Sequence, residues 1–195
     1  MGVLYEVERK FVFSRSLLSQ FHSNRGRPPF RSLVYSGNST FRDIYFDSSK
    51  ILASKGIWIR KRDQGWEAKV NLRDSFVKAA YNEITSVPEI RGIVSKHIPG
   101  NTAERENFGL QVFCDFTTYR SKYVADEKFN VVLDTTDFGH AVGEVEIMAS
   151  DVEKAEKDID QFFARYPWFF QGGTPKGKIS AYLELKKASS KKAGE

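Results

Sequence analysis

Three charged residues near the start of the chain alternate with mostly apolar ones. The stretch reads VLYEVERKF and places Glu6, Glu8 and Lys10 at every second position. Successive side chains of a β-strand point to opposite faces, so the three charges would share one face. Grouped carboxylates suit a hard divalent cation, and lysine suits phosphate oxygens. On this stretch alone, an edge strand with a wetted polar face and a helix with Glu6 one turn before Lys10 remain alternatives.

The same alternation returns along the chain. GIWIRKR places Trp58, Arg60 and Arg62 on one side of a strand, and the DQG that follows is typical of a hairpin turn. Glu67 and Lys69 then share a face on the returning strand. Similar patterns predict strands over residues 41–47, 79–87 and 116–124, on both sides of the turn DFGH, and within 177–187. About eight or nine short strands are therefore expected.

Helical patterns lie between these strands. Residues 14–21 begin with the capping residue Ser14, and residues 152–166 place their apolar side chains on one helical face. Residues 87–98 and 102–110 carry weaker patterns. Because an apolar helix face must be buried, we expect the helices to cover the apolar rows of the strands. The charged rows then face the other side of the sheet, in an α+β fold that is mainly antiparallel β.

A sheet of this size tends to curl and close, which would turn the charged rows inward. An open sheet would instead leave them in water. A closed interior cannot be dry because unpaired buried charges are costly, so it would hold water and a charged ligand. Arginines, lysines and carboxylates together indicate a site for a polyphosphate and a metal such as Mg²⁺. The expected interior residues are Glu6, Glu8, Lys10, Arg60, Arg62, Lys69, Arg120, Asp134, Glu144, Glu146 and Lys178.

Composition is that of a soluble globular protein, with 41% hydrophobic and 28% charged residues in a chain of 195. We expect one domain, residues 1–188, and a disordered basic tail, residues 189–195. The net charge of +5 favours an anionic partner, although the tail supplies part of it. The acids between positions 134 and 146 argue against simple nucleic-acid binding, so the expected partner is a small molecule.

Other residue types exclude several kinds of site. The three histidines lack metal-ligand spacing, and neither GxxxxGK[ST] nor GxSxG occurs. The single cysteine, Cys114, fits a reducing compartment. No apolar stretch has the length of a membrane span or the character of a secretory leader, so a cytoplasmic protein without a membrane partner is expected. We also expect a monomer.

Several motifs together resemble a known family. Residues 6–10, EVERK, match the ExExK signature of the CYTH superfamily, the triphosphate tunnel metalloenzymes. FRDIYFD, IWIRKRDQGWEAK and LDTTDFGHAVGEVE stand in the order and at about the spacing of its animal-type thiamine triphosphatases. The resemblance covers about residues 3–185. The chain departs from the family pattern only in loops: residues 22–40 look lengthened, and the part after Leu185 is short.

The resemblance implies a closed, eight-stranded antiparallel β-barrel with helices outside it. Its tunnel would bind thiamine triphosphate with Mg²⁺, or Mn²⁺ in its place, and hydrolyse it to thiamine diphosphate and phosphate. Glu144 or Glu146 would orient the attacking water, with Lys69 and Lys178 assisting. The implied metal-side carboxylates are Glu6, Glu8, Asp134, Glu144 and Glu146. The implied substrate-binding residues are Lys10, Arg60, Arg62, Lys69, Arg120 and Lys178, together with the tunnel acid Glu83.

The choice of substrate depends on aromatic side chains. Trp58 shares a face with Arg60 and could stack on the cationic thiazolium ring, with Tyr45 as a second candidate. Trp58 could equally be a packed aromatic. Two other functions stay open: a general inorganic or nucleotide-directed triphosphatase, since the same tunnel serves those reactions, and a non-catalytic binder of polyphosphate or RNA.

Overall fold

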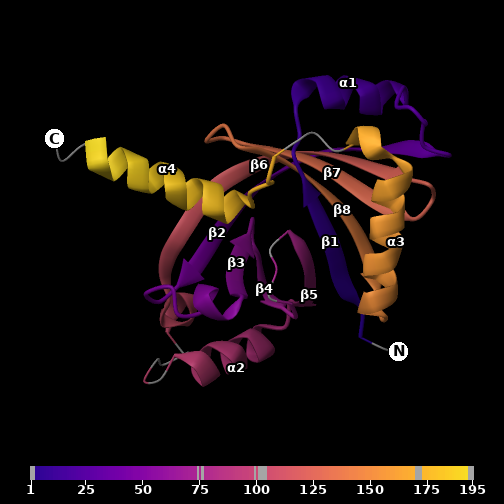
Figure 1. The fold of residues 1–195 in the computed structure, drawn as a ribbon. Coiled ribbons are helices and arrows are strands. Elements are labelled where there is room, and N and C mark those ends of the chain that lie inside the picture. Colours follow the sequence, from indigo (N-terminus) through magenta and orange to yellow (C-terminus); the bar gives the residue numbers. More distant parts are fainter. Residues whose placement is uncertain are drawn as a thin grey trace.

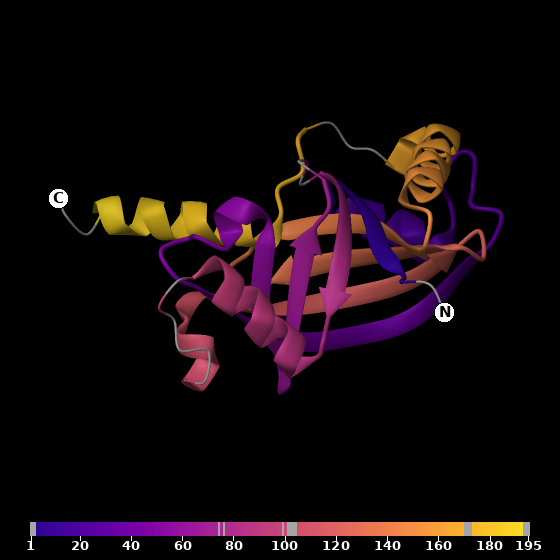
Figure 2. The ribbon, with the colours of Figure 1, turned by 90° about the horizontal axis from the view of Figure 1, so that it is seen from below.

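The computed structural model describes residues 3–73, 75, 77–98, 100, 105–169 and 173–192. Within these residues eight antiparallel strands form a closed barrel, in the order β1-β5-β4-β3-β2-β6-β7-β8 (Figures 1 and 2). The predicted fold class is therefore confirmed. The strands are β1 (Tyr5–Phe11), β2 (Leu33–Asp47), β3 (Ile57–Arg62), β4 (Gly65–Asn71), β5 (Lys78–Ile84), β6 (Gln111–Ala125), β7 (Phe129–Thr136) and β8 (Ala141–Ala149).

Helices lie outside the barrel, except that the last α-helix begins beside its interior (Figure 1). The α-helices are α1 (Arg15–Ser23), α2 (Val87–His97), α3 (Val152–Arg165) and α4 (Lys178–Lys192), and the short 3₁₀ helices are η1 (Ala53–Lys55), η2 (Glu106–Gly109) and η3 (Pro167–Phe169). Ser14 caps α1 by accepting a hydrogen bond from the Leu17 N–H at 3.4 Å. The expected helices at 14–21 and 152–166 are thus confirmed, and the weaker pattern at 87–98 forms α2. Of the pattern at 102–110, residues 102–104 lie outside the described residues and 106–109 form η2.

Two apolar clusters form where helices pack against the outer face of the barrel. In the larger one, Val7 and Val145 of adjacent strands pack with Ile159 and Phe163 of α3. In the smaller one, Ile59 and Ala68 of β3 and β4 pack with residues of α2. Each buried side chain of this kind contributes about 2 kcal/mol by transfer from water. This burial fixes which face of each strand points out, and the charged residues between them must point in.

The first and last strands close the ring. β1 pairs with β5 on one side and with β8 on the other. In the β1–β8 pairing Glu8 stands opposite Glu146, and Lys10 opposite Glu144. The predicted hairpin after β3 is also present, with Arg60 paired with Glu67 across β3 and β4.

The strand predicted within residues 177–187 is wrong. This segment begins α4, and Ile179, Tyr182 and Leu183 pack together at helical spacing around Tyr45 and Phe116. Alternation had suggested a strand, but Ala, Leu, Glu and Lys are strong helix formers and the spacing fits both periods. The helix continues to Lys192, into the segment where the sequence places a tail.

The loop expected at 22–40 is also shorter than the sequence suggested. β2 begins at Leu33 and pairs with β6 as far as Asp47. Its irregular start includes a register shift at Gly37, whose φ of +106° favours glycine. No helix among the described residues is long and apolar enough to cross a lipid bilayer.

Candidate active site

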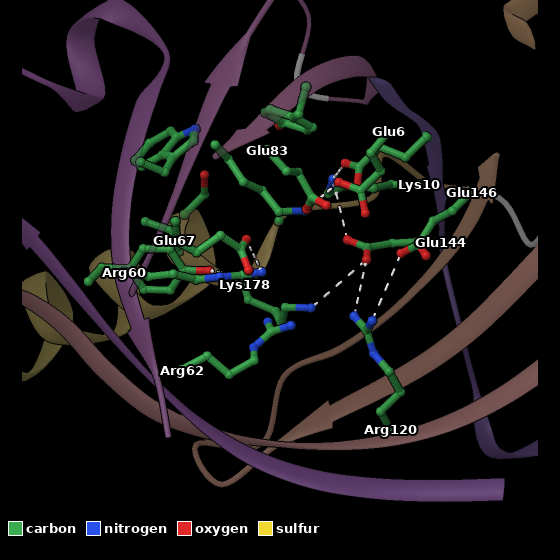
Figure 3. A pocket seen from close by; sticks show the side chains of 18 residues that line it. Glu6, Lys10, Arg60, Arg62, Glu67, Glu83, Arg120, Glu144, Glu146 and Lys178 are labelled. Carbon is green, nitrogen blue, oxygen red and sulfur yellow. Dashed lines mark hydrogen bonds and ion pairs between the residues drawn. The ribbon is translucent and has the colours of Figure 1, made fainter. Parts of the chain in front are cut away.

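A cavity of about 320 Å³ lies inside the barrel (Figure 3). Every cation expected from the sequence lines it, and six carboxylates face them. An interior with balanced and closely paired charges can be buried at far lower cost than one with a single sign. The charged lining residues are Glu6, Glu8, Lys10, Arg60, Arg62, Glu67, Lys69, Glu83, Arg120, Glu144, Glu146 and Lys178.

Three of the carboxylates gather at one place. An oxygen of Glu6, one of Glu8 and one of Glu146 all lie within 4.8 Å of one another. Alternation puts Glu6 and Glu8 on the inner face of β1, and the β1–β8 register puts Glu146 directly beside them. Three oxygen donors of this kind suit a hard divalent cation.

The negative charges of these three acids repel one another. Burial and the nearby charge of Glu6 raise the pKa of Glu146 to about 8. Burial also raises the pKa of Glu8, even though Lys10 beside it favours the ionised form. Glu6 differs, because Lys69 outweighs its burial and lowers its pKa. Without a cation between them, the three carboxylates therefore resist full ionisation.

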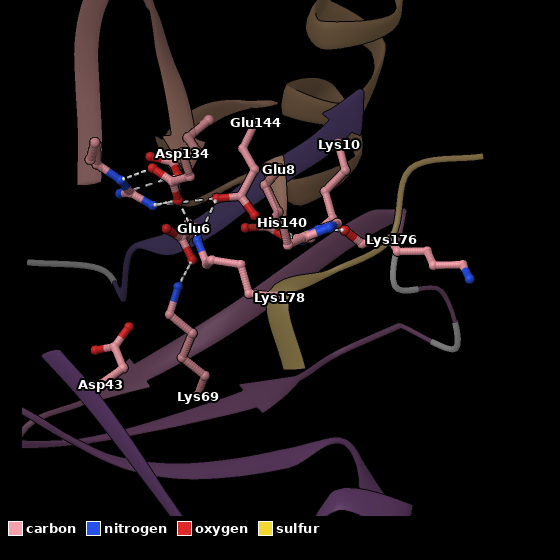
Figure 4. A network of polar contacts seen from close by, with 12 residues as sticks. Glu6, Glu8, Lys10, Asp43, Lys69, Asp134, His140, Glu144, Lys176 and Lys178 are labelled. Carbon is pink, nitrogen blue, oxygen red and sulfur yellow. Dashed lines mark hydrogen bonds and ion pairs between the residues drawn. The ribbon is translucent and has the colours of Figure 1, made fainter. Parts of the chain in front are cut away.

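Asp134 and Glu144 lie in a different environment (Figure 4). Asp134 accepts two hydrogen bonds from Arg120, at 2.7 Å from both Nε and Nη2, and a third from Lys178. Glu144 lies 3.3 Å from Lys10 Nζ and 3.5 Å from Arg120 Nη2. Burial opposes ionisation, but these cations hold the pKa of both acids below the usual range. Both are therefore ionised and hold cations, and neither belongs to the three-carboxylate group above.

The arginines of β3 are held by Tyr45 and by two carboxylates, Asp43 and Glu67, that the sequence did not name as site residues. Arg62 makes a two-pronged contact with the fully buried Asp43, at 2.7 and 2.8 Å. Arg60 Nη1 donates to the Tyr45 hydroxyl at 3.2 Å, and Nη2 donates to Glu67. Asp43 and Glu67 share strand parity with expected site residues, a signal that could have found them.

Lys69 and Lys178 enter from β4 and α4. Lys69 contacts Glu6, and its Nζ lies 2.8 Å from Glu83. Lys178 is the first residue of α4, and the first turn of that helix also lines the cavity through Ile179 and Ser180. The positive end of a helix dipole there favours an anionic ligand. The sequence placed Lys178 in the site while assigning it to a strand, and it missed the helix turn.

Comparison with known proteins decides the family. The model described as CYTH domain matches residues 4–167. This chain belongs to the CYTH family. It is 32% identical over 167 residues to a Homo sapiens protein named thiamine-triphosphatase, across 76% of this chain and 70% of that relative.

Solved structures share the fold of this CYTH chain. A protein from Pyrococcus horikoshii OT3 aligns with a TM-score of 0.57 and 17% identity, over 92% of this chain and 98% of the other. A Hippeastrum protein, described as having a dominant triphosphatase activity, aligns with a TM-score of 0.54 and 17% identity over 93% and 95% of the two chains. At such identity these two show the fold alone.

Both aromatic candidates, Trp58 and Tyr45, line the cavity of this CYTH chain, and they differ in how deeply they are buried. Trp58 lines the cavity and is only partly buried. Tyr45 is 6% exposed and stacks on Phe116 with ring centroids 5.8 Å apart. Trp58 also packs against the cluster of Tyr45, Cys114 and Phe116, but it is more exposed than Tyr45, which packs at the base of α4. Lys178 lies beyond the residues matched by the CYTH model, so α4 adds to the site from outside the matched region.

Proposed function

We propose that this chain hydrolyses thiamine triphosphate to thiamine diphosphate and phosphate, with Mg²⁺ bound in the barrel. The observation that carries the proposal is the group formed by Glu6, Glu8 and Glu146 in a cavity that also holds six cationic side chains. A metal site next to phosphate-binding cations is the arrangement that phosphoryl transfer requires. The similarity to thiamine-triphosphatase supports the choice of substrate.

Glu6, Glu8 and Glu146 fit a divalent metal because each offers an oxygen within reach of the other two. When bound, Mg²⁺ or Mn²⁺ would neutralise phosphate charge and lower the pKa of a coordinated water. Asp134 is not proposed as a ligand, since Arg120 and Lys178 already occupy its oxygens.

The remaining charged residues bind the phosphate chain and place the water. Arg60, Arg62 and Lys178 would hold phosphate oxygens and stabilise the charge that spreads over them in a loose transition state. Lys10, Lys69 and Arg120 surround the carboxylates and add to this positive field. Glu144 is the acid proposed to orient the attacking water, because its lowered pKa keeps it an acceptor.

Trp58 would select the organic part of the substrate. Its partly buried ring lines the same cavity as the cations. Stacking on a thiazolium ring is a cation–π contact worth roughly 1–2 kcal/mol when partly desolvated. The enzyme would act as a cytoplasmic monomer, in keeping with a free, buried Cys114.

The test is phosphate release from thiamine triphosphate, inorganic triphosphate and ATP, each with Mg²⁺, with Mn²⁺ and with a chelator. We expect metal-dependent release that is fastest from thiamine triphosphate. Faster release from inorganic triphosphate or ATP would assign one of the alternative triphosphatase activities. Binding of triphosphate with no release under any condition would mean a non-catalytic binder and would refute the proposal.

A further inference from the structure

The inner face of β2 contributes no cation to the cavity, yet it contacts all three of its arginines. We name this set the β2 inner row: it consists of Phe41, Asp43 and Tyr45. The Arg62 guanidinium carbon lies 3.9 Å from the centre of the Phe41 ring, and that of Arg120 lies 5.3 Å from it. The side chains of the β2 inner row therefore pack against all three arginines of the cavity.

Asp43 makes the strongest of these contacts. It stands directly opposite Arg62 in the β2–β3 pairing. Arg62 Nε donates to Oδ1 at 2.7 Å and Nη2 donates to Oδ2 at 2.8 Å, while Arg60 Nη1 lies 3.8 Å from Oδ2. A two-pronged contact of this kind fixes the plane of a guanidinium group as well as its position.

Because Asp43 is buried and does not line the cavity, it can affect a ligand only through the residues that it contacts. Its exposed fraction is 0%, and it is not one of the residues that line the cavity. Arg62 does line it, with 27% of its side chain exposed. A guanidinium has five N–H donors, so the contact with Asp43 leaves the opposite edge of Arg62 for a ligand. Burying a carboxylate is costly unless it is paired, and here the pairing orients two residues of the site.

We propose that Asp43 is a positioning residue: it holds Arg62, and with Tyr45 also Arg60, so that their N–H groups meet the triphosphate without rearrangement. The inference rests on the proposed function only in the identity of the ligand. Oriented donors accelerate phosphoryl transfer because they need no reorganisation when charge moves in the transition state. A loosely held arginine would lose that advantage even with its charge unchanged.

The molecule contains a matched control for this contact. Arg42, the residue before Asp43, makes the same two-pronged contact with Asp115, at 2.8 Å from Nε and 2.6 Å from Nη2. Alternation turns Arg42 to the outer face, where its side chain is 60% exposed and that of Asp115 is 34% exposed. The two contacts have the same chemistry and each includes one residue of β2, but the control contact lies on the outer face and is more exposed.

The experiment compares Asp43→Asn, Arg62→Lys, the double variant and Asp115→Asn in the full chain. With inorganic triphosphate and Mg²⁺, kcat/KM should fall on the order of 30-fold in Asp43→Asn and similarly in Arg62→Lys. The double variant should lose much less than the product of the two single losses, because Asp43 acts mainly through Arg62 and lies 3.8 Å from Arg60. Asp115→Asn should stay within about twofold of wild type.

A second readout needs no catalysis. In the ligand-free, ¹⁵N-labelled protein, the Arg62 Nε–H signal is identified by its loss in Arg62→Lys. We expect it to be ordered in the wild type and as mobile as an exposed arginine in Asp43→Asn. If the wild type hydrolyses no triphosphate, the proposed function fails, while this measurement still decides the role of Asp43.

Three results would overturn the inference. The first is an unchanged Arg62 signal in a folded Asp43→Asn variant. The second is a double variant whose loss equals the product of the single losses, which would mean that Asp43 acts independently. The third applies if Asp43→Asn does not fold. A hydrolysis rate of Arg62→Lys equal to that of the wild type would then show that the two-pronged contact is not needed.

Discussion

Two opposite walls of the barrel differ in how far their charged side chains are paired. On the β1–β8 wall, Glu8 and Glu146 stand directly across from each other, and the pKa of Glu146 is raised to about 8 by burial and neighbouring acids. On the β2–β3 wall, Arg62 is already held by Asp43, and Arg60 by Tyr45 and Glu67. The first wall has an electrostatic conflict that an added cation would relieve. The second has its charges satisfied and its geometry fixed before any ligand arrives.

The comparison indicates how one cavity can prepare for two ligands of opposite sign. A metal ion is spherical and needs uncompensated negative charge more than exact direction. A phosphate chain presents several oxygens in a defined geometry, so orientation of its donors matters as much as their charge. Each prediction below tests one wall against the other.

The largest effect is expected on the β1–β8 wall. Glu8→Gln or Glu146→Gln removes a charge but little volume, and should lower metal-dependent turnover on the order of a thousand-fold. Phosphate release and Mg²⁺ titration would measure the loss. Glu153→Gln, on the exposed surface of α3, is the control and should behave as wild type. Normal turnover in both tunnel variants would remove the metal from this wall.

On the opposite wall, Arg60→Ala should lower kcat/KM by about a hundred-fold and also lower the melting temperature. The stability loss follows because Glu67 and Asp43 lose a partner inside the barrel. Lys178→Ala should behave similarly, since it leaves Asp134 with Arg120 alone as its close partner among the described contacts. Steady-state kinetics and calorimetry measure both quantities.

The control for Arg60 is Lys61→Ala, which removes the next cation along β3 from the outer face. Its kcat/KM should match that of the wild type. If Arg60→Ala melted at a higher temperature than the wild type, the β2–β3 wall would be strained and not satisfied, and the contrast between the walls would fail.

A smaller effect is expected at Trp58. Trp58→Ala should slow hydrolysis of thiamine triphosphate by about tenfold, because a cation–π contact is lost, and should leave inorganic triphosphate nearly unaffected. Parallel kinetics with the two substrates give the ratio. Equal losses with both would mean that Trp58 packs the barrel, and no loss with either would move specificity to Tyr45.

The smallest effect is on stability against pH. Because the folded-state pKa of Glu146 is raised from 4.5 to about 8, the native state holds this proton more tightly than the unfolded chain does. The contribution to stability is fully present below about 4.5 and is lost as pH rises towards 8. With a chelator present, melting temperatures between pH 6 and 8.5 should therefore fall in the wild type by a few degrees more than in Glu146→Gln. Identical slopes in the two proteins would contradict this.

Strand alternation predicted most of the barrel because it is a local signal. β1 and the β3–β4 hairpin combine alternating charge with a recognisable turn or flank. The early part of β2, SGNST, carries no such alternation, and its extended shape depends on pairing with β6. α4 was missed because its apolar spacing satisfies two periods, and only its packing around Phe116 selects the helix.

The sequence predicted which residues line the candidate site better than it predicted which of them pair with one another. All six expected cations and four of the five expected metal-side acids line the cavity. The exception, Asp134, lies behind Arg120, and its pairing depends on the register between β6 and β7. Strand parity with Tyr45 could have placed Asp43 on the inner face, but its pairing with Arg62 depends on the register between β2 and β3.

Closure of the ring by β1 and β8 has a consequence for how the protein is made. Glu6 and Glu8 lie in the first strand and Glu146 in the last, so the three acids meet only once β1 has paired with β8. A nascent chain that has not yet released β8 from the ribosome holds two of the three acids and lacks the third. Pairing between segments so distant in sequence is intrinsically slow. Only chains in which β8 has been made and paired would therefore have high affinity for a divalent ion.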